Sequence, residues 1–389
     1  MAKYKLGDIC EIVSGSTPKS EVAEYWDGDI KWITPAELNE DSYIVSDSVR
    51  KITQMGVQKT GLTPFPAGTV ILSSRAPIGK VAIAGCEMYC NQGFKNLICS
   101  SVIDSRYLYW FLKGRTAYLN SLGRGATFKE ISKQIVASIE IEVPSLDQQI
   151  AIVQLLERIS EIMKARKQEL RTLDTLIKAR FVEMFGDPVA NSSGWNQTTL
   201  HEVTTKIGSG ATPRGGKESY QAEGISLIRS MNVHDGRFEY KDLAHITDEQ
   251  AEQLEGVTVR AHDVFINITG ASVARSCIVP DNVLPARVNQ HVAIIRCKQE
   301  YLNPVFANNL FLSDRFKGVL LDIGESGGAT RQAITKQQLE ELVVILPPIE
   351  LQRQFATFVS QVDKSKVAVQ AALNKDQLLF DSLMQQYFG

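Results

Sequence analysis

The sequence predicts an α+β protein in which two pseudo-symmetric α/β domains are joined by two long helices that form an antiparallel coiled coil. Three observations predict this class. Residues 146–185 contain no Gly or Pro, a similar stretch closes the chain, and short motifs of the first part recur in the same order in the second. The expected order is therefore domain, long helix, domain, long helix.

Composition limits what the chain can be. Its 389 residues, of which 44% are hydrophobic, suffice for two or three domains that each bury a core. The start is polar, which argues against a signal peptide, and no run of 18 apolar residues predicts a membrane span. The six cysteines form no CxxC pair, so they are expected to be reduced core thiols rather than disulfides or metal ligands. We therefore expect a cytoplasmic protein without a metal site.

The repeated motifs lie in two segments, 1–145 and 190–348, which we interpret as the two domains. In the first motif, Gly15 matches Gly210. The matching pairs are IVSGSTPK at 12–19 with KIGSGATPR at 206–214, PAGTVILSSR at 66–75 with RAHDVFINIT at 260–269, NQ at 91–92 with NQ at 289–290, and RGATFK at 124–129 with GGATRQ at 327–332.

Each domain is expected to combine short strands with helices. Runs of β-branched and apolar residues predict strands at 69–73, 81–84, 97–99 and 139–143. Apolar residues at helical spacing predict helices over 106–120 and 304–320. A turn-rich hinge at 186–194 leads into the second domain, so that the first spacer region is 146–189 and the second is 349–389.

The two long helices each carry an apolar seam at alternating steps of four and three, the spacing that is typical of a coiled coil. The first seam is Ile152, Leu156, Ile159, Met163, Arg166, Leu170, Leu173 and Ile177. The second is Phe355, Val359, Val362, Lys366, Val369, Leu373, Asp376, Phe380 and Leu383. Two amphipathic helices packed separately are the less favoured alternative, because the register is held along the whole length. An antiparallel pair would place the midpoints, Arg166 and Val369, side by side.

Motifs for catalysis are weak. The stretch 210–217 resembles a phosphate-binding loop, but Gly216 stands where that loop needs Lys, and Glu218 follows Lys217. The letters GESGG at 324–328 fit a nucleophile elbow, yet a predicted helix rather than a strand precedes them. The sequence therefore predicts a chain without a catalytic site of its own.

The order of domains and helices, the SGSTPK and SGATPR loops, the RGATFK and GGATRQ loops, and the FG ends of both helices resemble the specificity subunit of type I restriction–modification enzymes. The resemblance covers essentially the whole chain. It implies two target-recognition domains that each read one half of a split, asymmetric sequence in double-stranded DNA. It also implies helices that dock two methyltransferase subunits, S-adenosylmethionine bound in those partners rather than here, adenine as the methylated base, and motor-nuclease subunits that join for restriction in defence against phage.

Polar side chains on the repeated loops are the candidate DNA contacts, because such groups read base edges or bind phosphates. In the first domain they are Ser16, Thr17, Lys19, Ser74, Arg75, Lys80, Arg124, Thr127 and Lys129. In the second they are Thr212, Arg214, Arg229, Asn267, Thr269, Arg275, Thr330, Arg331 and Gln332.

Structural roles compete with DNA contact at several of these positions. Residues 15–18 also fit a turn capped by hydroxyls. Thr127 also fits the N-cap of a helix over 128–135, with Glu130 completing a capping box. The two Asn-Gln pairs have apolar neighbours, which favours buried groups that fix a loop.

Charge argues for weak DNA binding by the chain alone. Residues 1–145 hold 16 Lys and Arg against 15 Asp and Glu, and residues 190–348 hold 15 against 18. Because non-specific DNA affinity rises with the number of phosphates neutralised, partners are expected to supply much of the grip. A non-catalytic interaction scaffold without DNA specificity remains the alternative function. A fused single-chain methylase-nuclease is disfavoured, because the two domains and helices already occupy the whole sequence.

Overall fold

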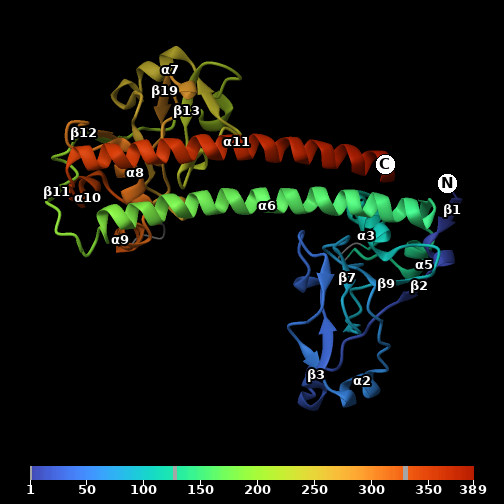
Figure 1. Cartoon of the computed structure of the whole chain (residues 1–389). Coiled ribbons are helices and arrows are strands. Elements are labelled where there is room, and N and C mark those ends of the chain that lie inside the picture. Colours follow the sequence, from blue (N-terminus) through green and yellow to red (C-terminus); the bar gives the residue numbers. More distant parts are fainter. Residues whose placement is uncertain (1, 126–128, 327–331) are drawn as a thin grey trace. The chain divides into compact units, whose positions relative to one another are not determined.

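The computed structural model describes residues 2–125, 129–326 and 332–389 and confirms the predicted fold class. The described chain divides into two compact units, and Figure 1 shows their helices and sheets. Unit 1 comprises Met1–Ala165 and Ala372–Gly389, and unit 2 comprises Arg166–Ala371. Each unit therefore contains one globular part and portions of both long helices.

Unit 1 is built around a five-stranded sheet. Its strand order is β2 (Cys10–Val13), β9 (Asn96–Cys99), β6 (Val70–Leu72), β7 (Val81–Ala84) and β4 (Ile44–Val45), antiparallel except between β7 and β4. A three-stranded sheet joins β5 (Lys51–Ile52), β3 (Trp26–Ile33) and β8 (Tyr89–Cys90), and β1 (Ala2–Lys5) pairs with β10 (Glu140–Val143). The helices are α1 (Leu6–Ile9), α2 (Gln54–Thr60), α3 (Ser105–Gly114), α4 (Thr116–Leu122) and α5 (Lys133–Ala137).

Unit 2 repeats this plan. A four-stranded antiparallel sheet joins β12 (Thr204–Ser209), β20 (Val292–Cys297), β17 (Val264–Asn267) and β18 (Ser276–Ile278). A three-stranded sheet joins β16 (Ala244–Ile246), β13 (Ile225–Ile228) and β19 (Ala286–Val288), and two strand pairs join β11 (Gln197–Thr199) with β21 (Val343–Ile345) and β14 (Val233–His234) with β15 (Arg237–Phe238). The helices are α7 (Asp248–Glu252), α8 (Pro304–Leu312), α9 (Asp314–Ser326) and α10 (Lys336–Glu340).

The long helices α6 (Leu146–Phe185) and α11 (Ile349–Phe388) pack together (Figure 1). In unit 1, Trp110 on α3 contacts Phe380 with ring centroids 5.6 Å apart, and the core also holds Ile152 and Phe388. In unit 2, the rings of Phe181 and Phe355 lie 5.5 Å apart. The beginning of each helix therefore lies beside the end of the other, which makes the pair antiparallel.

Two of the predicted helices are each broken in two. The helix expected over 106–120 is divided at Arg115, and the one over 304–320 is divided at Ser313, whose backbone is extended at φ −63° and ψ 136°. Apolar spacing alone did not reveal these breaks, because both halves bury apolar faces in the same core.

The helix considered over 128–135 was also wrong. Helix α5 begins only at Lys133, and the Ser132 hydroxyl caps it by accepting a hydrogen bond from the Ile135 amide. Glu130 precedes this helix and pairs with two basic side chains instead of completing a capping box.

Candidate nucleic-acid interface

A glycine in each unit allows the loop after the first sheet strand to pass very close to another backbone segment. A Cβ atom on Gly15 would lie 1.8 Å from the Cys90 carbonyl oxygen, and one on Gly210 would lie 1.9 Å from the Val288 carbonyl oxygen. Contacts this short are excluded for any side chain. Glycine is therefore required at both positions to bring these loops against the segments that precede the Asn-Gln pairs.

The same loops are tied down by matched hydrogen bonds. The Thr17 hydroxyl donates to Oε1 of Gln92, and the Thr212 hydroxyl donates to Oε1 of Gln290. Both glutamines are exposed, contrary to the expectation that they are buried.

The asparagines beside these glutamines fix their own loops. The Asn91 side chain accepts from the Gly93 amide at 2.9 Å, and the Asn289 side chain accepts from the His291 amide at 3.0 Å. Both members of each Asn-Gln pair therefore fix a loop: the asparagine fixes its own loop, and the glutamine fixes the loop that carries the threonine. The exposed glutamine carries both the bond to the threonine and free polar surface.

In unit 1, two tryptophans that the sequence reasoning missed hold the Ser14–Ser20 loop. The Trp32 indole donates to the Ser16 carbonyl at 3.1 Å, and the Trp26 indole donates to the Lys19 carbonyl at 3.1 Å. The two rings meet edge to face with centroids 5.2 Å apart. Both lie on β3 within seven residues of each other in a chain with four tryptophans, a concentration that could have drawn notice.

Two predicted DNA contacts instead satisfy backbone carbonyls. The Lys80 ammonium donates to the carbonyls of Pro35 at 3.0 Å and Leu38 at 2.5 Å. At the equivalent turn of unit 2, the Asn267 amide donates to the carbonyls of Ser230 at 2.9 Å and Val233 at 3.4 Å. Different side chains thus support the same short 3₁₀ turn in each unit.

Arg75 lies in a small ion-pair cluster. Its Nε donates to Glu130 at 2.9 Å, and the buried Lys95 ammonium, which the sequence reasoning missed, reaches the other oxygen of the same carboxylate at 3.2 Å. Burial raises the pKa of Glu130, but hydrogen bonds and charge from Arg75 and Lys95 outweigh it and lower the pKa below its ordinary value. Arg75 and Lys95 are therefore paired inside the unit.

The other predicted contacts of unit 1 divide by exposure. Lys19, Arg124 and Lys129 are exposed, Ser16 is half-buried, and Ser74 is fully buried. Thr127 lies outside the described residues. The exposed cations are consequently the members of this set that are accessible to phosphates or base edges.

Unit 2 shows a similar division. Thr212 and Arg214 are exposed, and Arg275 is half-buried. Three others form hydrogen bonds within the unit: Arg229 with the Asp242 carbonyl, Thr269 with His291 at 2.5 Å, and Gln332 with Glu325 at 2.8 Å. Thr330 and Arg331 lie outside the described residues.

The backbone brings the repeated loops to one end of each sheet. In unit 1, Arg75 and Arg124, which belong to two different motifs, both bridge to Glu130. In unit 2, Thr269 bridges to Ala333, and the Gly270 amide donates to the Gln332 carbonyl at 2.9 Å. Hydroxyl, amide and guanidinium groups from distant parts of the sequence are thereby collected on one polar surface per unit, and such groups suit base edges and phosphates.

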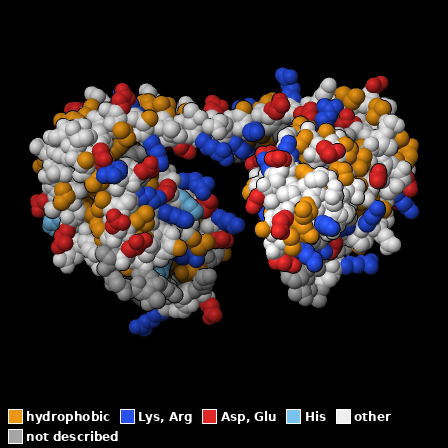
Figure 2. Space-filling model, turned by 90° about the horizontal axis from the view of Figure 1, so that it is seen from below, with side chains coloured by type: hydrophobic (Ala, Val, Ile, Leu, Met, Phe, Trp, Pro, Cys, Tyr) orange, Lys and Arg blue, Asp and Glu red, His pale blue; other side chains and the backbone are white. Residues whose placement is uncertain are grey.

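The charge on the face of the molecule seen in Figure 2 is mixed. Figure 2 shows Lys and Arg side chains interspersed with Asp and Glu side chains on both units. This distribution agrees with the nearly balanced charge of residues 1–145 and 190–348.

Other kinds of site were also sought. In the described part of the chain no group of three His, Cys, Asp or Glu side chains is placed to hold a metal ion. No helix among the described residues is both long and apolar enough to cross a membrane. All six cysteines are unpaired, and burial raises the pKa values of Cys90, Cys277 and Cys297 to about 12. These thiols are therefore protonated at neutral pH.

The predicted seam positions of the long helices lie where the helices are least exposed. Buried positions are Ile152, Leu156, Ile159, Met163, Ile177, Phe355, Val359, Val362 and Leu373. Half-buried positions are Arg166, Leu170, Leu173, Lys366, Val369, Asp376, Phe380 and Leu383. Lys366 forms a 2.7 Å ion pair with Asp174 across the helix pair, so this seam position is polar and paired.

The chain is similar to known proteins over most of its length. A family model described as the type I restriction modification DNA specificity domain matches residues 1–172 and 192–376. The type I restriction enzyme MjaIX specificity subunit of Methanocaldococcus jannaschii is 28% identical over 377 residues, which cover 91% of this chain and 85% of that protein. The EcoBI specificity subunit of Escherichia coli is 23% identical over 317 residues, covering 73% and 65%.

Solved structures share the fold. The S subunit of a type I restriction-modification system from M. genitalium superposes with a TM-score of 0.61 at 14% identity, covering 100% of this chain and 96% of the other. A chain from work on complex assembly and conformational transition of the type I R-M system gives a TM-score of 0.60 at 18% identity, covering 100% and 97%.

Proposed function

Because this chain belongs to the family of type I restriction–modification DNA specificity domains, we propose that it is the sequence-specific DNA-binding subunit of such a system. The observation that carries the proposal is the duplicated polar surface. Each unit holds a glycine-dependent loop tied by a Thr–Gln hydrogen bond, with polar side chains of neighbouring loops beside it.

Residues 1–145 and 190–348 are assigned as the two recognition domains, and each reads one half of a bipartite target. The loops share a backbone plan but differ in side chains. The repeat position occupied by Lys19 in the first domain is occupied by Arg214 in the second, and the position of Arg75 is occupied by Thr269. Since base readout depends on the side chains that reach the groove, the two half-sites differ and the target is asymmetric.

The helical regions 146–189 and 349–389 act as the spacer and dock two methyltransferase subunits. Those partners bind S-adenosylmethionine and methylate adenine, motor-nuclease subunits join for restriction, and this chain performs no chemical step. Exposed apolar side chains on the helices, including Val182 at 58% and Val367 at 71%, support a partner-binding role. The complex acts on DNA in the cytoplasm.

The test is methylation-aware sequencing of host DNA with and without this gene, in the presence of the partner methyltransferase. The proposal predicts methylated adenines in a split motif whose halves differ, and loss of that methylation when the gene is removed. An unchanged methylation pattern would favour the interaction scaffold without DNA specificity.

A second measurement addresses the charge balance of the two domains, 1–145 and 190–348. The isolated chain should bind DNA more weakly than the complete methyltransferase complex, because the Lys and Arg of both domains are nearly balanced or outnumbered by Asp and Glu. Salt-dependent binding by the isolated chain that is as tight as binding by the complex would contradict this part of the proposal.

A further inference from the structure

Arg50, which is not among the residues of the repeated motifs, is an exposed cation fixed in place by an aromatic pair. Its guanidinium carbon lies 3.6 Å from the centroid of the Trp26 ring and 5.7 Å from that of Trp32. In the described part of the chain no carboxylate lies within ion-pair distance of it. The guanidinium is thus held by stacking rather than by a salt bridge.

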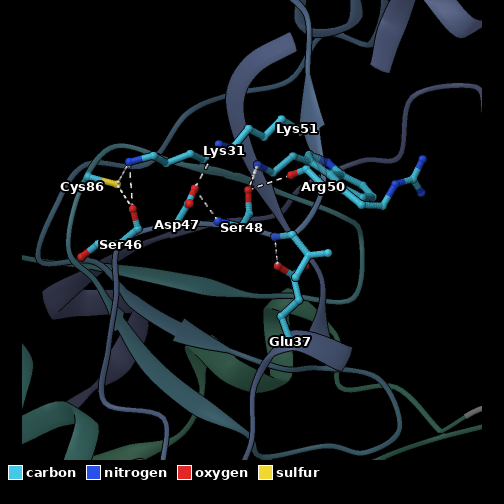
Figure 3. A network of polar contacts seen from close by, with 10 residues as sticks. Lys31, Glu37, Ser46, Asp47, Ser48, Arg50, Lys51 and Cys86 are labelled. Carbon is cyan, nitrogen blue, oxygen red and sulfur yellow. Dashed lines mark hydrogen bonds and ion pairs between the residues drawn. The ribbon is translucent and has the colours of Figure 1, made fainter. Parts of the chain in front are cut away.

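The backbone beneath Arg50 is also fixed. The buried Ser48 hydroxyl donates to the Arg50 carbonyl at 2.7 Å and accepts from the Trp32 amide at 2.9 Å. Glu37 accepts from the Val49 amide at 2.7 Å. Figure 3 shows this network, with the Arg50 guanidinium pointing away from it. The loop between β4 and β5 therefore presents this side chain in one orientation.

The same two tryptophans hold the loop that carries Ser16 and Lys19. Because their indole groups donate to the carbonyls of that loop, the stacked guanidinium and the Ser14–Ser20 loop share one support. Val49, beside Arg50, is 86% exposed. An exposed apolar side chain next to a fixed arginine suits a groove, where apolar groups contact thymine methyls and arginine contacts guanine.

We propose that Arg50 is a specificity-determining residue of unit 1 that contacts a guanine in the half-site read by this unit; the proposal rests on the proposed function. Stacking occupies the face of the guanidinium and leaves its in-plane N–H donors available. Two parallel donors match the O6 and N7 acceptors of guanine. Because the arginine is already oriented, little side-chain freedom is lost when the contact forms.

At the position of unit 2 that corresponds to Arg50, the described structure has no stacked arginine. In unit 1, Lys31 on β3 pairs with Lys51, and Arg50 is the residue before Lys51. In unit 2, Ser226 on the equivalent strand β13 pairs with His245, and the residue before His245 is Ala244. Ala244 therefore occupies the position of Arg50. Unit 2 has a different arginine beside an aromatic ring. The guanidinium carbon of Arg229, the residue that follows β13, lies 5.3 Å from the centroid of the Tyr220 ring. The Arg50 contact is consequently specific to one half of the target.

The experiment expresses the full chain with its partner methyltransferase subunits and determines the methylated motif by sequencing for wild type, Arg50→Ala, Arg50→Lys and Lys59→Ala. Lys59 is exposed at the end of α2 in the same part of unit 1, so its variant controls for loss of one charge. Arg50→Lys keeps the charge but not the paired donors, and it decides the question should Arg50→Ala fail to fold.

Both Arg50 variants are expected to relax one G·C position in one half-site, with discrimination there falling by about 5- to 150-fold, the range of a bidentate base contact. Lys59→Ala should keep the wild-type motif. An unchanged motif with Arg50→Lys, or methylation that falls equally at all sites, overturns the assignment. The absence of any motif with the wild-type chain would instead overturn the proposed function.

Discussion

In unit 1 the hydroxyl of Thr17 donates a hydrogen bond to Gln92, which lies 75 residues later in the chain. The bond joins the loop after β2 to the segment before β9. In unit 2 the bond from Thr212 to Gln290 joins the loop after β12 to the segment before β20. Each polar surface is therefore cross-linked at the same point by the same pair of residue types.

Removing this bond should loosen one loop only. Thr17→Ala is expected to weaken binding of the methyltransferase complex to its target duplex by about 2- to 10-fold, the value of one ordinary hydrogen bond. Discrimination should fall in the half-site of unit 1 and remain intact in the other. Thr17→Ser keeps the hydroxyl and serves as the control. Thr212→Ala should lower discrimination in the half-site of unit 2 and leave that of unit 1 intact. Equal loss in both half-sites with either alanine variant would argue against independent readers.

Lys80 should behave as a structural residue rather than a DNA contact. Lys80→Met keeps the stem but leaves the Pro35 and Leu38 carbonyls without their donor, so the free energy of unfolding should fall by about 1–3 kcal/mol. The slope of DNA affinity against salt concentration should not change. Lys129→Met is the matched control, because Lys129 is exposed and a lost phosphate contact there would reduce that slope by about one. A reduced slope with Lys80→Met would mean that its ammonium group leaves the carbonyls to bind phosphate.

Asp104 should make α3 sensitive to acid. Burial raises the pKa of its carboxyl, but hydrogen bonds and charge from Arg106, with amide bonds at the helix start, outweigh burial and lower the pKa below 3.8. A carboxyl with a lowered folded-state pKa stabilises the fold above its unfolded-state pKa, and this stabilisation is lost as pH falls through the folded-state value.

Asp104→Asn copies Asn303, the N-cap of α8 in unit 2, and keeps the cap without the charge. In thermal unfolding at pH 7, the free energy of unfolding of the wild type should exceed that of Asp104→Asn by no more than about 1 kcal/mol, because the ion pair with Arg106 is partly exposed. That advantage should shrink as the pH is lowered from 7 to 3. A difference that stays constant across this range would show that the charge has no part in it.

Arg166 is predicted to disfavour self-pairing of α6. Counting inward by 15 residues from Phe181 and from Phe355, which contact each other, reaches Arg166 on α6 and the neighbour of Val369 on α11. In an antiparallel homodimer of residues 1–189, two copies of Arg166 would meet at the midpoint, and the like charges would repel. The half-chain should therefore dimerise weakly, and Arg166→Val should strengthen the dimer. Sedimentation of both forms tests this, and equal dimer affinities would show that the predicted register is wrong.

The sequence was most informative about the long helices. An apolar seam without Gly or Pro is a strong periodic signal, and α6 begins at Leu146 and ends at Phe185. The repeated motifs likewise identified the glycine loops and the Asn-Gln pairs, because close backbone approach restricts which residues those places accept.

The roles of individual polar side chains were harder to predict. Lys80 and Asn267 look like exposed loop residues in the sequence, yet they serve carbonyls of a turn that lies more than 30 residues away. For Arg50 the sequence contains no motif that indicates a role. Only the pairing of β3 with β5 brings Trp26 beneath its guanidinium. Such contacts depend on side-chain geometry between distant segments, which periodicity and repeats do not encode.

The most direct test of two independent readers uses the glycines that each loop requires. Gly15→Ala and Gly210→Ala force a Cβ into the Cys90 and Val288 carbonyls, so each should displace one loop at a cost of about 1–3 kcal/mol. Gly208→Ala is the control, because its Cβ would meet only the flexible end of Lys206, at 3.6 Å. The measurement is the methylated motif of the host genome for each full-length variant. Gly15→Ala should degrade one half of a split motif, Gly210→Ala the other, and Gly208→Ala neither. The same half degraded by both variants, or a motif without two separate halves, would contradict the account.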